Sequence, residues 1–217
     1  MSLFEQPRVI TEAELPAADT PSAEICKRLV DNEIDDKIAI HWADMRVAER
    51  NYGTAAAVYG ALVPMKMLWL NQYPADKREL IGVTTFTYRA LLKLGKLDEA
   101  LTMLDALNKL YKDVGNHTGE NTYPRDFEVC GDICMERGNL DAAQRSYEIA
   151  KESEKLRTLF GVLTKTLEQE LDSSVVDLEK AKILLGIIVR TENALAEIAN
   201  YDQTLAYEYR GNVSDDD

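Results

Sequence analysis

Leu94-Gly95-Lys96-Leu97-Asp98-Glu99-Ala100 joins two helical patterns through a single glycine, with no room for a longer loop. The same order of glycine, polar residue, leucine, acid, any residue and alanine recurs in Arg137-Gly138-Asn139-Leu140-Asp141-Ala142-Ala143. A more altered third copy is Asn51-Tyr52-Gly53-Thr54-Ala55. Glycine is the usual residue just beyond a helix, where the chain turns back. The pattern therefore predicts an all-α fold of antiparallel helical hairpins that stack on one another.

An alanine marks each copy, and the three alanines, Ala55, Ala100 and Ala143, lie 45 and 43 residues apart. A larger side chain follows each alanine by one helical turn: Tyr59, Leu104 and Tyr147. A small residue lets two helices approach, and the larger one fills the gap against the next helix. Ala181, with Leu185 one turn later, is a candidate for a fourth copy, at a shorter spacing of 38 residues from Ala143.

Apolar residues at three-four spacing predict the helices and their ends. The expected ranges are 20–32, 35–48, 54–63, 65–70, 74–94, 97–114, 124–136, 140–171 and 175–209. Thr20 is expected to cap the first helix, and Pro64 to kink or interrupt the third. A break is expected within residues 152–156, because an unbroken helix there would run roughly 50 Å with nothing to pack on.

Composition indicates a soluble, helical domain of ordinary size. The 217 residues are 46% hydrophobic and 29% charged, and a chain of this length buries roughly 70% of its unfolded surface. The longest apolar stretch, Ile183 to Val189, is too short to span a membrane. Early acids such as Glu5 and Glu12 do not fit a secretion signal, so we expect a cytoplasmic protein. The expected organisation is a disordered arm over residues 1–19, one helical domain over 20–210 and a disordered acidic tail over 211–217.

The net charge of −13 repels nucleic acid and anionic membranes, so neither is an expected partner. Acidity is also a common means of keeping a protein soluble.

Three cysteines suggest a reducing compartment, since one stays unpaired under any disulfide scheme. Cys130 and Cys134 are one helical turn apart and could bring two thiolates near a metal, but no histidine lies at zinc-ligand spacing. We interpret them as small buried residues at a helix contact. No metal and no cofactor is expected.

These residues resemble the tetratricopeptide repeat. In the copy marked by Ala143, Gly131 lies twelve residues before that alanine, where that family has the small residue of its first helix, and Tyr147 and Ala150 fall at its later positions. The corresponding residues of the other copies are Ala43 and Tyr88. The family period is about 34 residues, so this chain would belong to the longer-period relatives. The resemblance covers about residues 35–155 and implies a short right-handed superhelix.

The resemblance also implies a concave groove that binds a peptide or helix of a partner protein. Carried over position by position, the partner-binding residues are Lys37, Asp44, Arg89, Lys93, Arg125, Glu128, Asp132 and Glu136. Ile40 and Asp44 stand where the chaperone-type subclass has the lysine and asparagine that grip a C-terminal carboxylate, so that type of clamp is not expected. Arg89, Lys93 and Arg125 could form a basic spot for an acidic group, or be solvated charges on a helix face.

Sequence motifs of catalysis are not found. His41 and His117 are not tied to a nucleophile by any motif, and no phosphate-binding loop, G-x-S-x-G or H-E-x-x-H occurs. We therefore predict a non-enzymatic adaptor with no catalytic residues. Two alternatives stay open: a self-associating subunit that pairs through residues 183–201, and a helical enzyme or small-ligand sensor with a pocket between helices.

Overall fold

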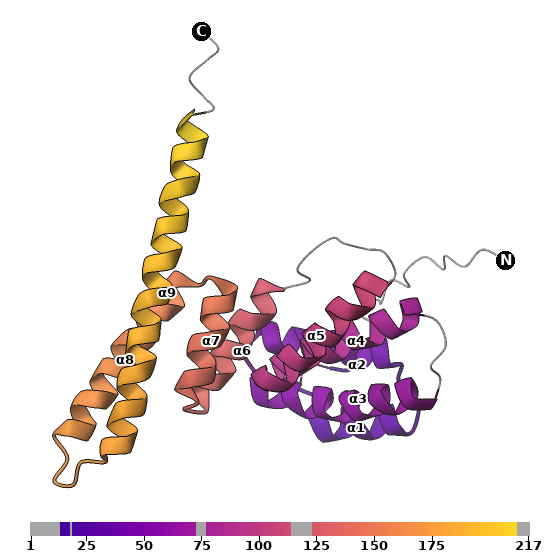
Figure 1. Ribbon diagram of the computed structural model, residues 1–217. Coiled ribbons are helices and arrows are strands. Elements are labelled where there is room, and N and C mark those ends of the chain that lie inside the picture. The colour runs from indigo at the N-terminus through magenta and orange to yellow at the C-terminus, as the bar shows by residue number, and fades with distance from the viewer. Residues whose placement is uncertain (1–13, 18, 73–76, 114–122, 212–217) are drawn as a thin grey trace. The chain divides into compact units, whose positions relative to one another are not determined.

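The computed structural model describes residues 14–17, 19–72, 77–113 and 123–211, and within these ranges the chain forms nine helices and no strand. Neighbouring helices pack against each other, which confirms the predicted all-α fold (Figure 1). The described residues divide into two compact units, unit 1 before the gap at residues 114–122 and unit 2 after it. A single domain over residues 20–210 stays a prediction. Among the described helices none is long and apolar enough to cross a membrane.

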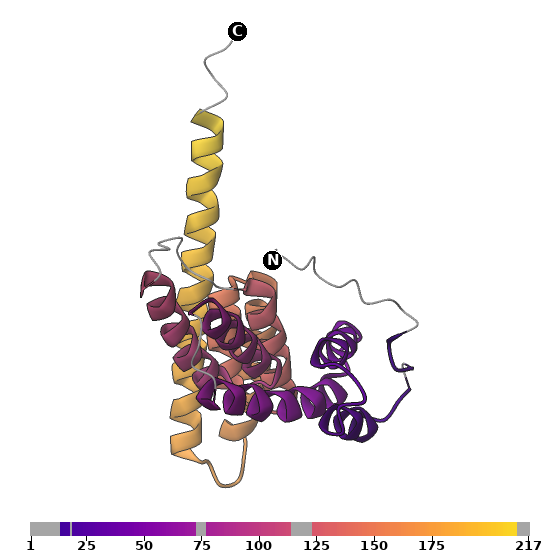
Figure 2. The ribbon, with the colours of Figure 1, turned by 90° about the vertical axis from the view of Figure 1, so that its right-hand side faces the viewer.

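Unit 1 contains the first five described helices of the chain. Its helices are α1 (Ser22–Val30), α2 (Asp36–Ala48), α3 (Tyr52–Gln72), α4 (Lys77–Lys93) and α5 (Leu97–Asp113). Helix α3 contacts α1, α2 and α4, and α5 packs on α4 (Figure 2). Trp42, Tyr59 and Leu62 are the largest side chains of the main core cluster and are almost completely buried. Helix α3 is therefore the central element of this unit.

Unit 2 consists of two consecutive hairpins. Its helices are α6 (Pro124–Glu136), α7 (Leu140–Ala150), α8 (Ser153–Leu171) and α9 (Leu178–Gly211). Helix α6 packs on α7, and α7 packs on both α8 and α9. Phe127, Leu156, Leu159 and Leu163 are fully buried. The predicted break in the long helical stretch is real: Lys151 and Glu152 separate α7 from α8.

The glycine turns have the predicted form. At the α4–α5 turn Gly95 has a φ of 70°, the Lys96 N–H donates to the Leu91 carbonyl at 3.0 Å, and the Gly95 N–H donates to the Leu92 carbonyl at 2.9 Å. This pair of bonds is the Schellman motif. Gly138, with a φ of 72°, makes the same bonds at the α6–α7 turn. Each glycine precedes its buried alanine by five residues.

The third copy turns at a residue that the sequence analysis did not choose. Arg50, and not Gly53, has the left-handed φ of 59°, and it also lies five residues before its buried alanine, Ala55. Gly53 lies inside α3. The same left-handed turn occurs at Asn32 and Lys151. Three of these five turns therefore use a residue with a side chain, so glycine alone does not locate them.

The candidate fourth copy at Ala181 is wrong. Leu185 is 53% exposed and fills no gap between helices. The α8–α9 turn before it is held by side chains instead: Glu170 accepts the N–H of Asp177 at 3.0 Å and pairs with Lys180 at 2.5 Å. The Asp177 carboxylate accepts the N–H groups of Glu179 and Lys180, both at 3.1 Å. Because this aspartate is a good cap, α9 begins at Leu178 and not at residue 175.

Two further expectations concern the helix ends. Helix α3 continues through Pro64, so the interruption considered there does not occur, while a kink at this residue stays a prediction. Pro64 is exposed, so water can bind the carbonyl that loses its N–H partner, and apolar contacts on either side hold the helix together. Thr20 does not cap α1, which starts after Pro21 without a side-chain cap.

Two sets of predictions fall outside the described residues: the start of the helix expected at residue 74, and most of the arm and tail expected at the two ends of the chain. In the described part of the expected N-terminal arm, the Ala17 carbonyl accepts the indole N–H of Trp42 at 3.3 Å. This bond ties Ala17 to α2.

Candidate functional site

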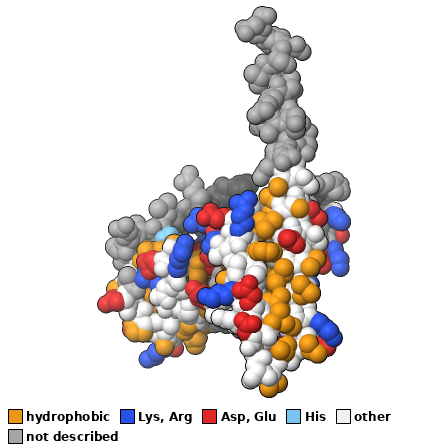
Figure 3. Space-filling model, turned by 90° about the vertical axis from the view of Figure 1, so that its left-hand side faces the viewer, with side chains coloured by type: hydrophobic (Ala, Val, Ile, Leu, Met, Phe, Trp, Pro, Cys, Tyr) orange, Lys and Arg blue, Asp and Glu red, His pale blue; other side chains and the backbone are white. Residues whose placement is uncertain are grey.

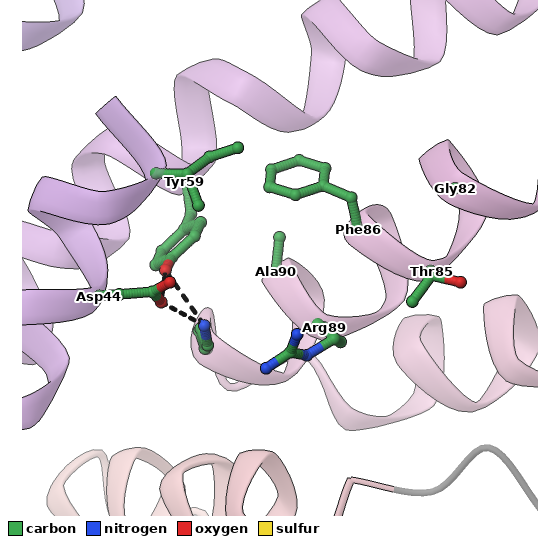
Figure 4. A pocket seen from close by; sticks show the side chains of 9 residues that line it. Asp44, Tyr59, Gly82, Thr85, Phe86, Arg89 and Ala90 are labelled. Atoms are coloured by element: carbon green, nitrogen blue, oxygen red, sulfur yellow. Dashed lines mark hydrogen bonds and ion pairs between the residues drawn. The ribbon is translucent and has the colours of Figure 1, made fainter. Parts of the chain in front are cut away.

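A pocket of about 240 Å³ opens between α2, α3 and α4 of unit 1 (Figure 4). Helix α4 supplies most of its wall, because residues one turn apart on a helix share a face. The lining residues are Ile40, Asp44, Tyr59, Gly82, Thr85, Phe86, Arg89, Ala90 and Lys93. Three residues that the sequence assigns to partner binding, Asp44, Arg89 and Lys93, are thus brought together here.

One end of the pocket is a polar contact between three helices. Lys93 of α4 pairs with the Asp44 carboxylate of α2, and Tyr59 of α3 donates its hydroxyl to the same carboxylate. The Lys93 ammonium also donates to the Tyr59 hydroxyl at 3.2 Å and lies 5.2 Å from the centre of the Tyr59 ring. The Lys93 side chain is only 9% exposed and Asp44 is 43% exposed. Lys93 is therefore a buried cation whose charge Asp44 balances, not an open binding group.

The remainder of the pocket combines an apolar wall with a second cation. Phe86 and Ala90 point from α4 towards Tyr59, and the Arg89 guanidinium extends towards the Asp44 side (Figure 4). Arg89 is half-buried. A guanidinium has five N–H donors, so it can bind an acidic group in addition to neighbours it already contacts. The pocket thus offers an apolar surface beside a planar donor.

Unit 2 contains the same three-residue contact. Tyr147 of α7 donates its hydroxyl to Asp132 of α6 at 2.8 Å, and Lys155 of α8 pairs with Asp132 at 2.7 Å. Glu128, one turn before Asp132, lies 3.8 Å from the same ammonium. Asp132 precedes Ala143 by eleven residues, as Asp44 precedes Ala55. The polar contact therefore repeats with the turn and the alanine.

The other predicted binding residues lie apart from the pocket. Lys37 is exposed in the first turn of α2, where its backbone N–H donates to the Asp35 carboxylate at 2.8 Å. Arg125 and Glu136 are exposed at the two ends of α6. Since Arg125 belongs to unit 2, its part in a shared basic spot with Arg89 stays a prediction.

Sequence reasoning missed the polar role of both tyrosines and missed Lys155 altogether. Tyr59 and Tyr147 were expected only to fill space. A signal was present, because in both copies the aspartate lies fifteen residues before the tyrosine. No such signal exists for the lysines, which lie 49 and 23 residues after their aspartates.

A second pocket of unit 1, of about 390 Å³, is lined by Asp36, Leu62, Met65, Lys66 and Val83. Asp36 pairs with Lys66. Burial raises the pKa of Asp36, but hydrogen bonds with Asp35 and Lys66 and the charge of Lys66 outweigh it and leave the pKa below its usual value. The carboxylate is thus ionised at neutral pH and bound to its lysine.

Cys130 and Cys134, which lie one helical turn apart, are both buried in α6. A hydrogen bond with Cys134 and burial both raise the pKa of the Cys130 thiol far above its usual range, so it stays protonated and is a poor metal ligand. In the described ranges no group of three or more histidines, cysteines and acids could hold a metal ion. His41 is exposed on α2, and His117 lies outside the described residues.

Comparison of the chain with protein-family models, with curated proteins and with solved structures finds no match. The resemblance to tetratricopeptide repeats thus stays a prediction.

Proposed function

We propose that the chain is a non-enzymatic interaction module that binds a segment of a partner protein at the pocket between α2, α3 and α4. The observation that carries the proposal is the composition of this pocket, which places Arg89 beside the apolar surface of Phe86 and Ala90. The volume of about 240 Å³ is below the roughly 300 Å³ at which small-molecule sites begin. It suits one or two side chains of an extended peptide better than a whole metabolite.

The expected ligand is an acidic residue next to an apolar or aromatic one. A carboxylate can bind the Arg89 guanidinium through two parallel hydrogen bonds. The neighbouring apolar group would be buried against Phe86 and Ala90, which adds affinity in proportion to the area covered. Lys93 balances the charge of Asp44, which reduces the repulsion between Asp44 and the acid of the ligand. This chemistry also fits an otherwise acidic protein, because Arg89 would be a local cation in a repulsive field.

Two features support a longer-period tetratricopeptide-like array as the scaffold of this module. The three marker alanines are fully buried, and turn, alanine and aspartate keep fixed offsets in the copies marked by Ala55 and Ala143. All three cysteines are free thiols, which fits the reducing cytoplasm where we propose that the protein acts.

The proposal is tested by selecting ligands from a displayed library of random peptides on the immobilised chain. Selected peptides are expected to share an acidic residue beside an apolar one. Titration calorimetry with the best peptide should then give at least about tenfold weaker binding to Arg89→Glu, because an interface arginine is a frequent hot spot.

Lys109→Glu is the matched control, since Lys109 is an exposed cation on α5 outside the pocket. It makes the same charge change and should leave the affinity nearly unaltered. Equal affinity for the wild type and Arg89→Glu, or selected peptides without an acid, would contradict the proposal.

A further inference from the structure

Helix α9 has more apolar surface than its own unit covers. Leu184, Ile187 and Ala194 are buried on the side where α9 packs against α8 and α7. Large apolar side chains beside them stay exposed: Leu178 at 67%, Leu185 at 53% and Val189 at 48%. Figure 3 shows hydrophobic side chains gathered in a band along the α8–α9 hairpin. An apolar band of this kind on a charged protein marks an interface.

The exposed residues follow a regular spacing. Steps of four and three residues connect Leu178, Lys182, Leu185, Val189, Glu192 and Ala196, and all six are exposed. This is the a/d spacing of a two-helix seam. The seam lies on the side of α9 opposite its buried residues, and the partly buried Ile188 lies between the two sides. One additional helix could therefore cover it without disturbing the fold.

The seam is complementary to a second copy of itself that runs in the opposite direction. If two copies of α9 run antiparallel about a twofold axis near residue 187, Leu178 lies opposite Ala196, Leu185 opposite Val189 and Lys182 opposite Glu192. Each layer joins an a position to a d position, as an antiparallel pair requires, and the symmetry makes every contact twice. A large residue meets a small one, and a cation meets an acid. A parallel pair would instead place Lys182 against Lys182 and Glu192 against Glu192.

We propose that the occupant of this seam is the α9 helix of a second copy of the chain, in antiparallel orientation and with Lys182 opposite Glu192. Lys182 now pairs with Glu179 at 2.7 Å, but both side chains are more than two-thirds exposed. An ion pair this exposed contributes little to stability. Lys182 can therefore leave Glu179 and pair with Glu192 of the second copy. The dimer is independent of the pocket of unit 1, so either proposal can fail without the other.

The orientation is tested by charge reversal in the full chain, with sedimentation velocity at micromolar concentrations as the readout. Lys182→Glu and Glu192→Lys should each raise the dimer Kd about tenfold, since each turns two attractive contacts into repulsive ones. The double variant K182E/E192K should restore the wild-type Kd. Loss of the dimer without rescue would overturn the antiparallel register, because a parallel pair has like charges opposed in the double variant too.

The apolar part is tested by a matched pair of substitutions. Leu185→Glu should raise the Kd about a hundredfold, because it removes two buried leucines from the dimer. Ile183→Glu makes a similar change at a side chain that is 62% exposed but off the seam, and should change the Kd by no more than about twofold. Circular dichroism should be unchanged for both. A monomeric wild type, or a larger effect of Ile183→Glu, would overturn the proposal.

Discussion

The same tyrosine–aspartate–lysine contact serves two environments in this molecule. In unit 1 Asp44 is 43% exposed at the rim of a pocket and Lys93 is 9% exposed beneath it. In unit 2 the order is reversed, because Asp132 is 18% exposed and Lys155 is 28% exposed. The two units also differ at the position twelve residues before the marker alanine, which is Gly131 in unit 2 and Ala43 in unit 1. The comparison indicates that the contact is a repeated structural device, and that only its more open form borders a candidate site.

The largest effect should come from Gly131→Ala. A Cβ at Gly131 would lie 2.3 Å from Cε1 of Tyr147, and this ring is buried and held by Asp132, so it cannot move away freely. We expect a loss of about 3 kcal/mol in the free energy of unfolding, which is the upper end of what overpacking typically costs.

Gly161→Ala is the control for this substitution. Gly161 is exposed within α8 and has open space around it, so the same change should stabilise the protein by up to about 1 kcal/mol. Urea denaturation of both variants measures the difference. Equal values for the two variants would show that α6 and α7 are not closely packed at Gly131.

The next effect distinguishes the two lysines. Lys155→Met removes a cation from the mostly buried Asp132 and from Glu128 beside it, so it should cost about 2 kcal/mol. Lys93→Met leaves Asp44 able to reach water, and should cost only about 1 kcal/mol although Lys93 is the more buried lysine. Denaturation curves compare the two. A larger loss for Lys93→Met would mean that burial of the cation, and not of the acid, decides the energy of this contact.

The smallest effect is a difference in acid sensitivity between the units. The hydrogen bond with Lys180 and the Asp177 N–H hold the pKa of Glu170 below its usual value of 4.5. Its stabilisation is therefore complete above pH 4.5 and is lost as the pH falls through the lowered folded pKa. For Asp36 of unit 1 the corresponding loss begins only below 3.8.

Thermal unfolding measured from neutral pH to about pH 3 should show that unit 2 begins to lose stability at a higher pH than unit 1. For Glu170→Gln the midpoint of unfolding should depend less on pH below 4.5. Glu168→Gln, an exposed neighbour on α8, is the control and should leave the profile unchanged. Identical profiles for Glu170→Gln and the wild type would contradict the lowered pKa.

The sequence predicts the helices well where local chemistry decides them. Pro124 begins α6 and Gly138 forms the turn after it as expected, because proline fixes φ at a helical value and glycine adopts a left-handed φ without steric cost. Prediction fails where packing overrides local preference, as at Pro64, or where an unexpected residue takes a left-handed φ, as at Arg50.

The candidate site is predictable only in part. Asp44, Arg89 and Lys93 are expected from the resemblance to tetratricopeptide repeats, and all three line the pocket. That Lys93 is buried and neutralised does not follow, because it depends on how α4 approaches α3 and Tyr59. Lys155 lies in a helix whose start depends on a left-handed Lys151, and no local signal marks that residue.

The turns that place a residue other than glycine at a left-handed φ are sites where a substitution could stabilise the protein. Arg50 holds a conformation that costs a residue with a side chain roughly 1 kcal/mol and glycine much less. Its turn lies away from the pocket, and it belongs to a different helix hairpin from the α9 seam. A more heat-resistant version of this chain could therefore be sought at position 50 with a single glycine, while every residue assigned to recognition keeps its native identity.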